Sequence, residues 1–310
     1  MKILITGSQG QLGTELIKQL NVSKSEKNLK IFAPSKNELN LLNLESCENY
    51  VKDLKPDILI NLAAYTAVDK AENDIYNANK INGLALQSFA NAVKYYGGYI
   101  IQISTDYVFN GKQKFPYKTN ASRDPLCIYG KTKALGEYFL EDILSNNNQF
   151  TIIRTSWLIS PWGKNFVKTI IKKLAENKEN LNVVCDQIGC LTTANNLALL
   201  LRLIIKKKMN NELLPSHLHW SSSGETSWYK IALKIKEISH SINLVNSSVD
   251  IQPIKTIEYK TLCPRPKFSL LDTSITQEKI GIKSNFWEVD LEMLLKEIKN
   301  LKKSNKLSFY

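Results

Sequence analysis

The sequence is poor in the residues that build disulfide frameworks and spaced metal sites. Its 310 residues include five cysteines and three histidines. An odd number of cysteines without a C-x-x-C pair is typical neither of a small disulfide framework nor of a zinc motif. No further potential metal ligands are grouped with His217, His219 and His240 in the sequence, so we expect these histidines to be structural or surface residues. We therefore predict buried free thiols and no metal site.

Long apolar runs are also absent. A membrane-spanning helix needs roughly 18 or more consecutive apolar residues. The best candidates, residues 58–65 and 197–205, are short and contain Asn61 and Arg202. The apolar run at the N-terminus is too short for a signal peptide and leads directly into a glycine loop. These features predict a cytoplasmic protein without a membrane partner.

Arginine is scarce in a chain of net charge +12, because only four of its 41 basic residues are arginines. Arginine is the residue that makes bidentate contacts with phosphates and bases. The lysines are spread along the chain and are not gathered in one stripe. We interpret the charge as a solvated lysine-rich surface and predict no nucleic-acid partner, while part of the charge can attract an anionic substrate.

The first half alternates short apolar runs with segments whose apolar residues recur at helical spacing. The expected strands are residues 2–6, 29–33, 57–63, 99–104 and 150–154, and the expected helices are residues 11–20, 46–54, 76–96 and 129–144. Repeated strand–helix units predict an α/β fold with a doubly wound parallel sheet of the Rossmann type, covered by helices on both faces.

The second half is less regular. We expect helices at residues 165–176, 194–207, 227–239 and 287–302, a strand at 218–221, a turn-rich segment at 253–267 and a loose tail. We assign residues 1–155 to a dinucleotide-binding core, to which elements return at about residues 180–210. Residues 156–310 are assigned mainly to a smaller, interleaved substrate-binding region.

Three glycines, Gly7, Gly10 and Gly13, lie between the first predicted strand and the first predicted helix. Glycine permits a tight turn and a close backbone approach to a pyrophosphate, and the helix N-terminus offers free N–H groups. The pattern predicts a dinucleotide-binding loop, with an ordinary strand–helix turn as the alternative. Ser35 and Lys36 follow the second strand where an acidic residue would bind a ribose. These two residues can accept the 2′-phosphate of NADPH, which favours NADPH over NADH. The alternative is that they are two exposed loop residues without a role in cofactor binding.

Tyr129 and Lys133 are four residues apart, which places both on one face of a helix. Reduction of a ketone needs a hydride on carbon and a proton on oxygen, and a lysine cation favours the phenolate of a nearby tyrosine. Thr105 ends a predicted strand, where ligands of a doubly wound sheet bind, so its hydroxyl can contact a substrate carbonyl. The alternative is that Tyr129 and Lys133 are two exposed helix residues and that Thr105 belongs to an ordinary Ser/Thr/Asp turn.

The glycine loop, Thr105, Tyr129 and Lys133, in this order, resemble the extended branch of the short-chain dehydrogenase/reductase superfamily. Longer segments resemble the dTDP-4-dehydrorhamnose reductase family: residues 61–72 (NLAAYTAVDKAE), 104–109 (STDYVF), 154–157 (RTSW), 186–192 (DQIGCLT) and 265–272 (RPKFSLLD). The resemblance covers nearly the whole chain. It implies NAD(P)H-dependent reduction of the C4 keto group of dTDP-4-dehydro-L-rhamnose, a step in nucleotide-sugar and surface-polysaccharide biosynthesis.

The resemblance also implies a role for each matched residue. Tyr129 would donate the proton, Lys133 would be its partner on the cofactor ribose, and Thr105 would orient the keto group. The implied cofactor contacts are the loop residues Gly7, Gly10, Gln11, Leu12 and Gly13, then Asn40 and Leu41 near the adenine, and Ala63, Ala64, Tyr65 and Thr66 along the cofactor cleft. Asp106 and Trp157 would border the sugar pocket beside Thr105 and Tyr129, although Trp157 also fits the pattern of a core aromatic residue.

Two features depart from the family or from its neighbours. Some relatives bind Mg²⁺ between subunits through glutamates, and Glu15 matches one of these, but residues 193–196 (TANN) lack the second carboxylate. We therefore expect no Mg²⁺, and either a monomer or a homodimer. A sugar-nucleotide dehydratase would carry an acid pair after the threonine, whereas Asp106 is followed by Tyr107. An epimerase, another reductase of nucleotide-linked 4-keto-6-deoxy sugars and a non-catalytic regulatory subunit remain alternatives.

Overall fold

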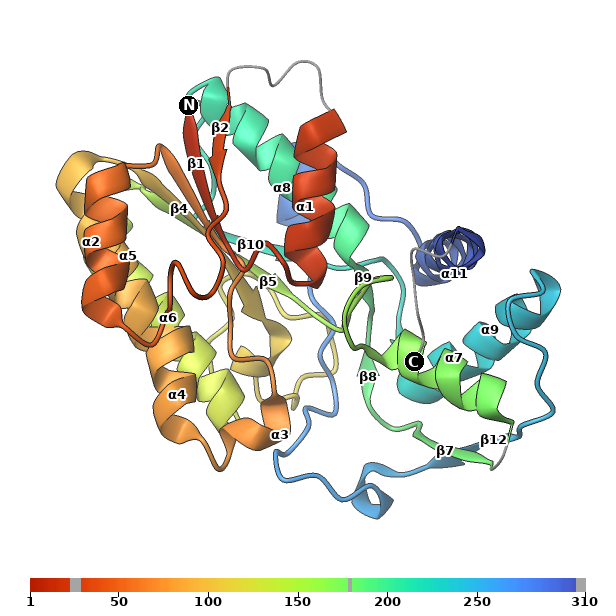
Figure 1. Cartoon of the computed structure of the whole chain (residues 1–310). Coiled ribbons are helices and arrows are strands. Elements are labelled where there is room, and N and C mark those ends of the chain that lie inside the picture. Colours follow the sequence, from red (N-terminus) through yellow and green to blue (C-terminus); the bar gives the residue numbers. More distant parts are fainter. Residues whose placement is uncertain (23–28, 178–179, 305–310) are drawn as a thin grey trace.

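The computed structural model describes residues 1–22, 29–177 and 180–304, and six parallel strands form its main sheet (Figure 1). The strands lie in the order β10-β5-β4-β3-β1-β2, where β1 is Lys2–Thr6, β2 is Lys30–Phe32, β3 is Ile58–Asn61, β4 is Tyr99–Thr105, β5 is Phe150–Thr155 and β10 is His217–Trp220. Every pairing is parallel. The predicted doubly wound sheet is confirmed, and the chain reverses its winding between β1 and β3.

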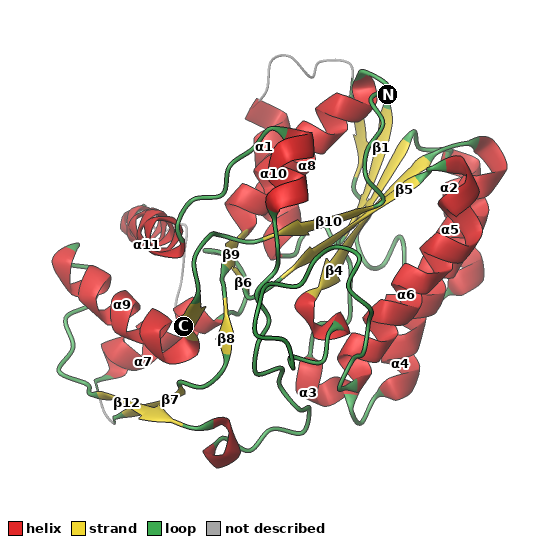
Figure 2. Ribbon diagram, turned by 180° about the vertical axis from the view of Figure 1, so that it is seen from behind, coloured by secondary structure: helices red, strands yellow, loops and turns green. Residues whose placement is uncertain are grey.

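Helices cover both faces of this sheet because its buried strands carry apolar side chains on alternate faces. In β1, Ile3 and Ile5 pack into one core while Leu4 packs into the other. The first core contains α1 (Gln11–Val22), α8 (Ala194–Met209) and α10 (Ser274–Ile280), and the second contains α2 (Leu44–Leu54), α5 (Ala85–Tyr96) and α6 (Ile128–Leu144). Figure 2 shows the two helical layers on either side of the strands.

The helix expected at residues 76–96 is not a uniform α-helix. It consists of α4 (Ile75–Asn79), a π-helical turn (Lys80–Leu84) and α5. Other boundaries shift by a few residues: β2 and β3 are shorter than predicted, and α2 begins earlier because Asn43 caps it by accepting a hydrogen bond from Ser46 N. The loose tail predicted for the last residues falls mainly on residues 305–310, outside the described part.

A third hydrophobic core lies beyond the carboxyl edge of the sheet. Its helices are α7 (Phe166–Glu176), α9 (Trp228–Ser241) and α11 (Trp287–Lys303). Short strand pairs join this region: β6 (Leu158–Ile159) with β9 (Thr192–Thr193), β7 (Leu181–Val184) with β12 (Ile251–Ile254), and β8 (Ile188–Gly189) with β11 (Thr226–Ser227). The pairing of β12 places a strand partly inside the segment expected to be turn-rich.

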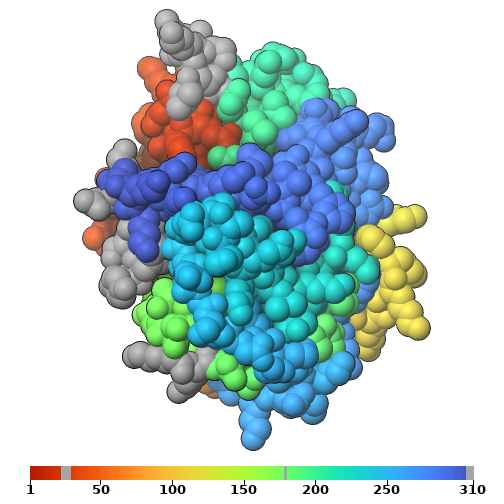
Figure 3. All heavy atoms as spheres, turned by 90° about the vertical axis from the view of Figure 1, so that its right-hand side faces the viewer, coloured from red at the N-terminus to blue at the C-terminus, as the bar shows by residue number. Residues whose placement is uncertain are grey.

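The chain passes between the main sheet and this third core several times. After β9, α8 and β10 return to the main sheet, and α10 returns to it again. α11 packs on α9 and is also joined to α1, since Lys18 and Glu297 form an ion pair with Nζ and Oε1 2.9 Å apart. Figure 3 shows the dark-blue α11 lying between α1 and α9 on this face. The division of the chain into a dinucleotide-binding core and a substrate-binding region at residue 155 remains a prediction.

The remaining elements are short. They are α3 (Val68–Ala71) and 3₁₀ turns at Asp106–Val108, Ser145–Asn147 and Thr256–Glu258. Within the described ranges, no helix has the length and apolar character that crossing a membrane requires.

Candidate active site

Polar side chains gather where neighbouring parallel strands end. Thr6 of β1 is in register with Asn61 of β3, and Thr105 of β4 with Thr155 of β5. The Thr6 hydroxyl donates to Asn61 Oδ1 at 2.5 Å, and Asn61 Nδ2 donates to Gln102 Oε1 at 2.8 Å. The loops that follow these strands therefore start from one edge, where doubly wound sheets bind ligands.

The glycine loop lies at this edge and has the shape of a phosphate-binding turn. Gly7 has a φ of +65°, and a Cβ there would lie 2.6 Å from the backbone nitrogen of Ala63. A Cβ at Gly13 would collide with the backbone of Gly7 and Ser8, whereas Gly10 is exposed and would meet only Gly7 O, at 3.2 Å. The loop therefore lets α1 pack closely and leaves backbone open at Gly10, which fits a pyrophosphate.

The two residues after Gly10 use their side chains elsewhere. Leu12 is buried in the core between α1 and the sheet. Gln11 Oε1 accepts hydrogen bonds from Ser160 Oγ and Asn165 Nδ2, both at 2.9 Å. The Leu12 side chain therefore cannot meet a bound pyrophosphate, and the carbonyl oxygen of the Gln11 side chain is already engaged.

The loop after β2 contains an acidic group that the sequence interpretation missed. Ser35 is partly buried and Lys36 is exposed, as expected for a loop at this edge. Glu38 Oε2 accepts a hydrogen bond from Ser35 N at 2.7 Å, and this bond lowers the pKa of Glu38. The carboxylate thus opposes a 2′-phosphate at Ser35 and suits ribose hydroxyls. Farther along, Asn40 is exposed and Leu41 is buried.

Asn82 fixes the loop that follows β3. Its Oδ1 accepts from Tyr65 N at 2.9 Å, and its Nδ2 donates to Tyr65 O at 3.2 Å and to Thr132 Oγ1 at 3.1 Å. Asn82 is buried in the π-helical turn, a feature that often marks functional sites. The loop residues Ala63, Ala64 and Tyr65 are partly buried and Thr66 is exposed. The sequence carried no clear signal for Asn82, because several other polar residues lie on the same helical segment.

α6 carries Tyr129 and Lys133 on one face, as predicted. Lys133 is buried, and its Nζ donates to Ile103 O in β4 at 2.7 Å. Burial lowers the pKa of Lys133 to about 8, although Glu137 acts in the opposite direction. Burial raises the pKa of Tyr129, while the adjacent Thr105 hydroxyl lowers it to a smaller extent. The expected phenolate is therefore not favoured here, and the neutral phenol can act as a proton donor.

Thr105 and Asp106 complete this group at the end of β4. The Thr105 hydroxyl donates to Asp106 Oδ1 at 2.9 Å and accepts from Tyr107 N at 3.2 Å. Asp106 is 2% exposed, and its Oδ2 has no hydrogen-bond partner among the described residues. Burial raises the pKa of Asp106 to about 7, against a lowering by Thr105. A carboxyl oxygen without a partner at this place can bind a sugar hydroxyl.

A buried ion network, which sequence reasoning also missed, holds α6 against the sheet. Glu137 lies one turn after Lys133 and is fully buried, with Arg154 Nη2 2.7 Å from its Oε2. Arg123 Nη1 lies 3.1 Å from the same oxygen, and Ser104 Oγ donates to Oε1 at 2.5 Å. Burial raises the pKa of Glu137, but the arginines and Ser104 outweigh it and leave the pKa lowered.

Trp157 packs as a core residue while standing just beyond β5. Its ring stacks on Trp228, with ring centroids 3.9 Å apart. Its φ is +45°, a backbone conformation that costs energy in a bulky residue and is often kept at functional sites. Because Trp157 is only partly buried, both expected roles, core aromatic and border of the sugar pocket, fit this position.

The histidines are structural or surface residues, as expected, and the cysteines are unpaired. His219 is fully buried, and burial followed by the charge of Arg154 lowers its pKa to about 3. His217 contacts Glu141, with Nε2 and Oε1 2.9 Å apart, and His240 is exposed. All cysteines are free thiols; Cys185 is partly buried and the others are buried.

Glu15 is not presented as a metal ligand. Its carboxylate is fully buried, and it accepts hydrogen bonds from Trp162 Nε1 at 2.5 Å and from Asn195 Nδ2 at 3.4 Å. N–H donors therefore face both oxygens, an arrangement that does not fit Mg²⁺, which prefers oxygen ligands.

Comparisons with known proteins agree with this geometry. The family model described as RmlD substrate binding domain matches residues 1–300. The spore coat polysaccharide biosynthesis protein SpsK of Bacillus subtilis (strain 168) is 38% identical, over 96% of this chain and 97% of its own.

Two solved structures have the same fold. A dTDP-4-dehydrorhamnose reductase from Clostridium acetobutylicum is 35% identical, with a TM-score of 0.85 and coverage of 96% of this chain and 100% of that one. A dTDP-4-dehydrorhamnose reductase from Bacillus anthracis, solved in complex with NADP, is 33% identical, with a TM-score of 0.82 and coverage of 96% and 99%. With this similarity along nearly its whole length, the chain belongs to the dTDP-4-dehydrorhamnose reductase family.

Proposed function

We propose that this protein catalyses the NAD(P)H-dependent reduction of the C4 keto group of dTDP-4-dehydro-L-rhamnose to dTDP-L-rhamnose. The observation that carries the proposal is the meeting of Thr105, Tyr129 and Lys133 at the carboxyl edge of the sheet that also holds the glycine loop. Membership of the reductase family supports the same substrate. The product places the protein in nucleotide-sugar and surface-polysaccharide biosynthesis.

A nicotinamide cofactor, when bound, supplies the hydride for C4. Tyr129 donates its phenolic proton to the C4 oxygen, since its raised pKa keeps it protonated at neutral pH. The Thr105 hydroxyl orients that oxygen, and Asp106 and Trp157 border the sugar. Lys133, with a pKa of about 8, is mainly an ammonium group at pH 7 and would hold the hydroxyls of the cofactor ribose.

NADPH is the proposed cofactor, with NADH as the alternative. A relative bound to NADP and the exposed Lys36 support NADPH, whereas the carboxylate of Glu38 at Ser35 N favours NADH. The proposal includes no Mg²⁺ and no nucleic-acid partner. It describes a cytoplasmic enzyme that is a monomer or a homodimer and whose partner is the nucleotide sugar.

Oxidation of NADPH, followed by absorbance with dTDP-4-dehydro-L-rhamnose generated in situ, tests the proposal. We expect sugar-dependent oxidation with dTDP-L-rhamnose as product. Tyr129→Phe should lower kcat by a factor of about 100 or more and leave NADPH binding intact, because it removes only the proton donor. Tyr138→Phe, at an exposed position of the same helix, is the matched control.

Undiminished turnover of Tyr129→Phe would contradict the catalytic assignment. Tight cofactor binding without oxidation of either NADPH or NADH would contradict the substrate assignment. That result would favour a different keto sugar, an epimerase or a regulatory subunit.

A further inference from the structure

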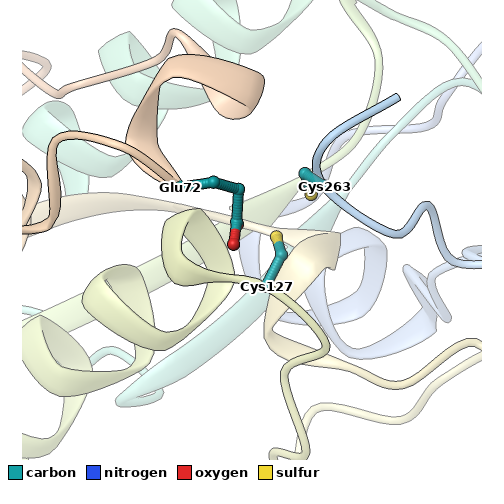
Figure 4. Close-up of side chains that lie close together, drawn as sticks. All are labelled: Glu72, Cys127 and Cys263. Atoms are coloured by element: carbon teal, nitrogen blue, oxygen red, sulfur yellow. The ribbon is translucent and has the colours of Figure 1, made fainter. Parts of the chain in front are cut away.

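Three potential metal ligands that lie far apart in the sequence meet beside the catalytic helix (Figure 4). Glu72 follows α3, Cys127 is the residue before α6, and Cys263 lies in the segment that leads from Thr256–Glu258 towards Arg265. One carboxylate oxygen and the two sulfur atoms all lie within 4.8 Å of one another. Figure 4 shows the three side chains pointing toward one another from separate segments.

Backbone hydrogen bonds hold the three segments in place. Glu72 Oε1 accepts from Ile128 N at 2.8 Å, at the first turn of α6. Cys263 N donates to Asp69 Oδ1 at 3.1 Å, and Asp69 also pairs with Arg265 at 2.5 Å. The bond to Ile128 uses one carboxylate oxygen of Glu72 and leaves the other for a further contact. The ligand groups are therefore positioned by the fold and not by a local sequence motif.

Both thiols of the cluster are buried and neither is in a disulfide. The Cys263 Sγ donates to Pro264 O at 3.3 Å. A cation that binds here would displace the thiol protons, as it does wherever cysteine is a metal ligand.

Two thiolates and one carboxylate are a ligand set for a cation such as Zn²⁺, which prefers sulfur, nitrogen and carboxylate ligands in tetrahedral geometry. Zn–S bonds of about 2.3 Å and Zn–O bonds of about 2.1 Å would require the cluster to contract by roughly 1 Å. Both thiols are buried while Glu72 is only partly buried, so the carboxylate side gives a cation access. A water molecule would supply the fourth ligand.

We propose that Glu72, Cys127 and Cys263 form a binding site for a thiophilic divalent cation, Zn²⁺. The bound cation ties the segment around Cys263 to the start of α6. The site is separate from the residues proposed to bind cofactor and sugar. Arg265, two residues after Cys263, contacts the hydroxyl of Tyr107 at 3.4 Å, and the Tyr107 ring lies edge-on to Tyr129. The cation thus fixes a segment that reaches the neighbourhood of Tyr129.

Titration of the full-length protein with Co²⁺, in the presence of a phosphine reductant, tests this site directly. We expect a thiolate-to-cobalt charge-transfer band that saturates at one equivalent and is abolished by one equivalent of Zn²⁺. Cys127→Ser and Cys263→Ser should each lose the band, and Glu72→Gln should raise the Kd for Co²⁺ at least tenfold. Cys185→Ser, which changes a partly buried cysteine outside the cluster, should behave like the unsubstituted protein.

A band that persists in both cluster variants, or no band in the unsubstituted protein, would overturn the proposal. Because either serine variant can fail to fold, alkylation of the unsubstituted protein provides a second measurement. One equivalent of Zn²⁺ should slow alkylation of Cys127 and Cys263 at least tenfold, as mapped by mass spectrometry, and leave Cys47 and Cys190 unaffected. Equal protection of all four cysteines, or of none, would contradict the site independently of reductase activity.

Discussion

Glu38 places a negative charge where the adenosine ribose of a bound cofactor would lie. Replacing it with glutamine keeps an acceptor for Ser35 N but removes the charge that repels a 2′-phosphate. We expect Glu38→Gln to raise the ratio of kcat/KM for NADPH to kcat/KM for NADH about fivefold, because the carboxylate no longer repels the 2′-phosphate. Steady-state kinetics with both cofactors gives this ratio.

The control for this variant is Glu45→Gln, an exposed glutamate on α2. It removes the same charge from the surface without touching the loop after β2. A ratio that changes equally in both variants would mean that Glu38 has no specific effect on cofactor choice.

Asp106 should make the stability of the protein depend on pH. Burial raises the pKa of Asp106 from 3.8 in the unfolded chain to about 7 in the folded chain. The stability contributed by the protonated carboxyl is complete below pH 3.8 and is lost as the pH rises towards 7. In this window the free energy of unfolding should fall by up to about 1 kcal/mol per pH unit from this group alone.

Asp106→Asn removes this dependence, so the variant should gain stability relative to the unsubstituted protein between pH 4.5 and about pH 7. Urea unfolding at several pH values measures the difference. Asp272→Asn is the control because its pKa is lowered, which confines its effect to more acidic solutions. A difference between Asp106→Asn and the unsubstituted protein that does not change with pH would refute the buried, protonated carboxyl.

At the scale of elements, the contact between α6 and the π-helical turn depends on Gly136. A Cβ at this position would collide with the backbone oxygen of Asn82. Gly136→Ala should therefore destabilise the protein by about 1–3 kcal/mol, as expected for overpacking. It should also lower kcat, because Tyr129 and Lys133 move with α6.

Chemical denaturation and steady-state kinetics check this prediction. Lys131→Ala, at an exposed position on the same helix, should change stability by less than about 0.5 kcal/mol. Gly136→Ala with native stability and native kcat would show that the two helices have room to separate.

Most elements of the sheet and of its helices could be predicted because the chain alternates clear apolar runs with helical spacing. The positions of three proposed site residues could be predicted as well, since Tyr129 and Lys133 are neighbours on one helix and Thr105 ends a strand. The π-helical turn could not, because it adds a residue to a turn without changing the apolar pattern that predicts a helix. Residue spacing alone does not distinguish a π-helical turn from a regular α-helical turn.

The supporting residues could not be predicted for a different reason. Glu137 and Arg154 meet only when α6 packs on β5, and their ion pair reflects tertiary contacts. Glu72, Cys127 and Cys263 likewise come together only in the folded chain. Spacing rules detect local ligands, so the absence of a C-x-x-C pair carried no information about this cluster.

At the scale of the whole molecule, the sheet does not become complete within residues 1–155. α8 covers one face of the sheet together with α1, and β10 pairs with β5. A fragment of residues 1–155 should therefore expose a large apolar face and fail to fold. Circular dichroism and the denaturant dependence of its fluorescence, compared with residues 1–304, test this expectation.

Cooperative unfolding of the short fragment would show instead that the first five strands and their helices form an independent domain. The full-length protein should unfold in a single transition, because α11 and the elements that return to the main sheet join that sheet to the third core. Two separate transitions would contradict this coupling.

The late arrival of β10 has a consequence for synthesis on the ribosome. β5 is complete at Thr155, but its outer partner begins only at His217, after α7, the short strands β6, β7, β8 and β9, and α8 have been made. Until then the backbone groups along the free side of β5 have no strand to pair with, and until α8 (Ala194–Met209) is made the apolar face that it covers is also exposed. A nascent chain at this stage carries an unpaired sheet edge, which is prone to bind other chains. The yield of the protein in the cell should therefore depend on chaperones, which shield that edge until β10, the last strand of the main sheet, is made.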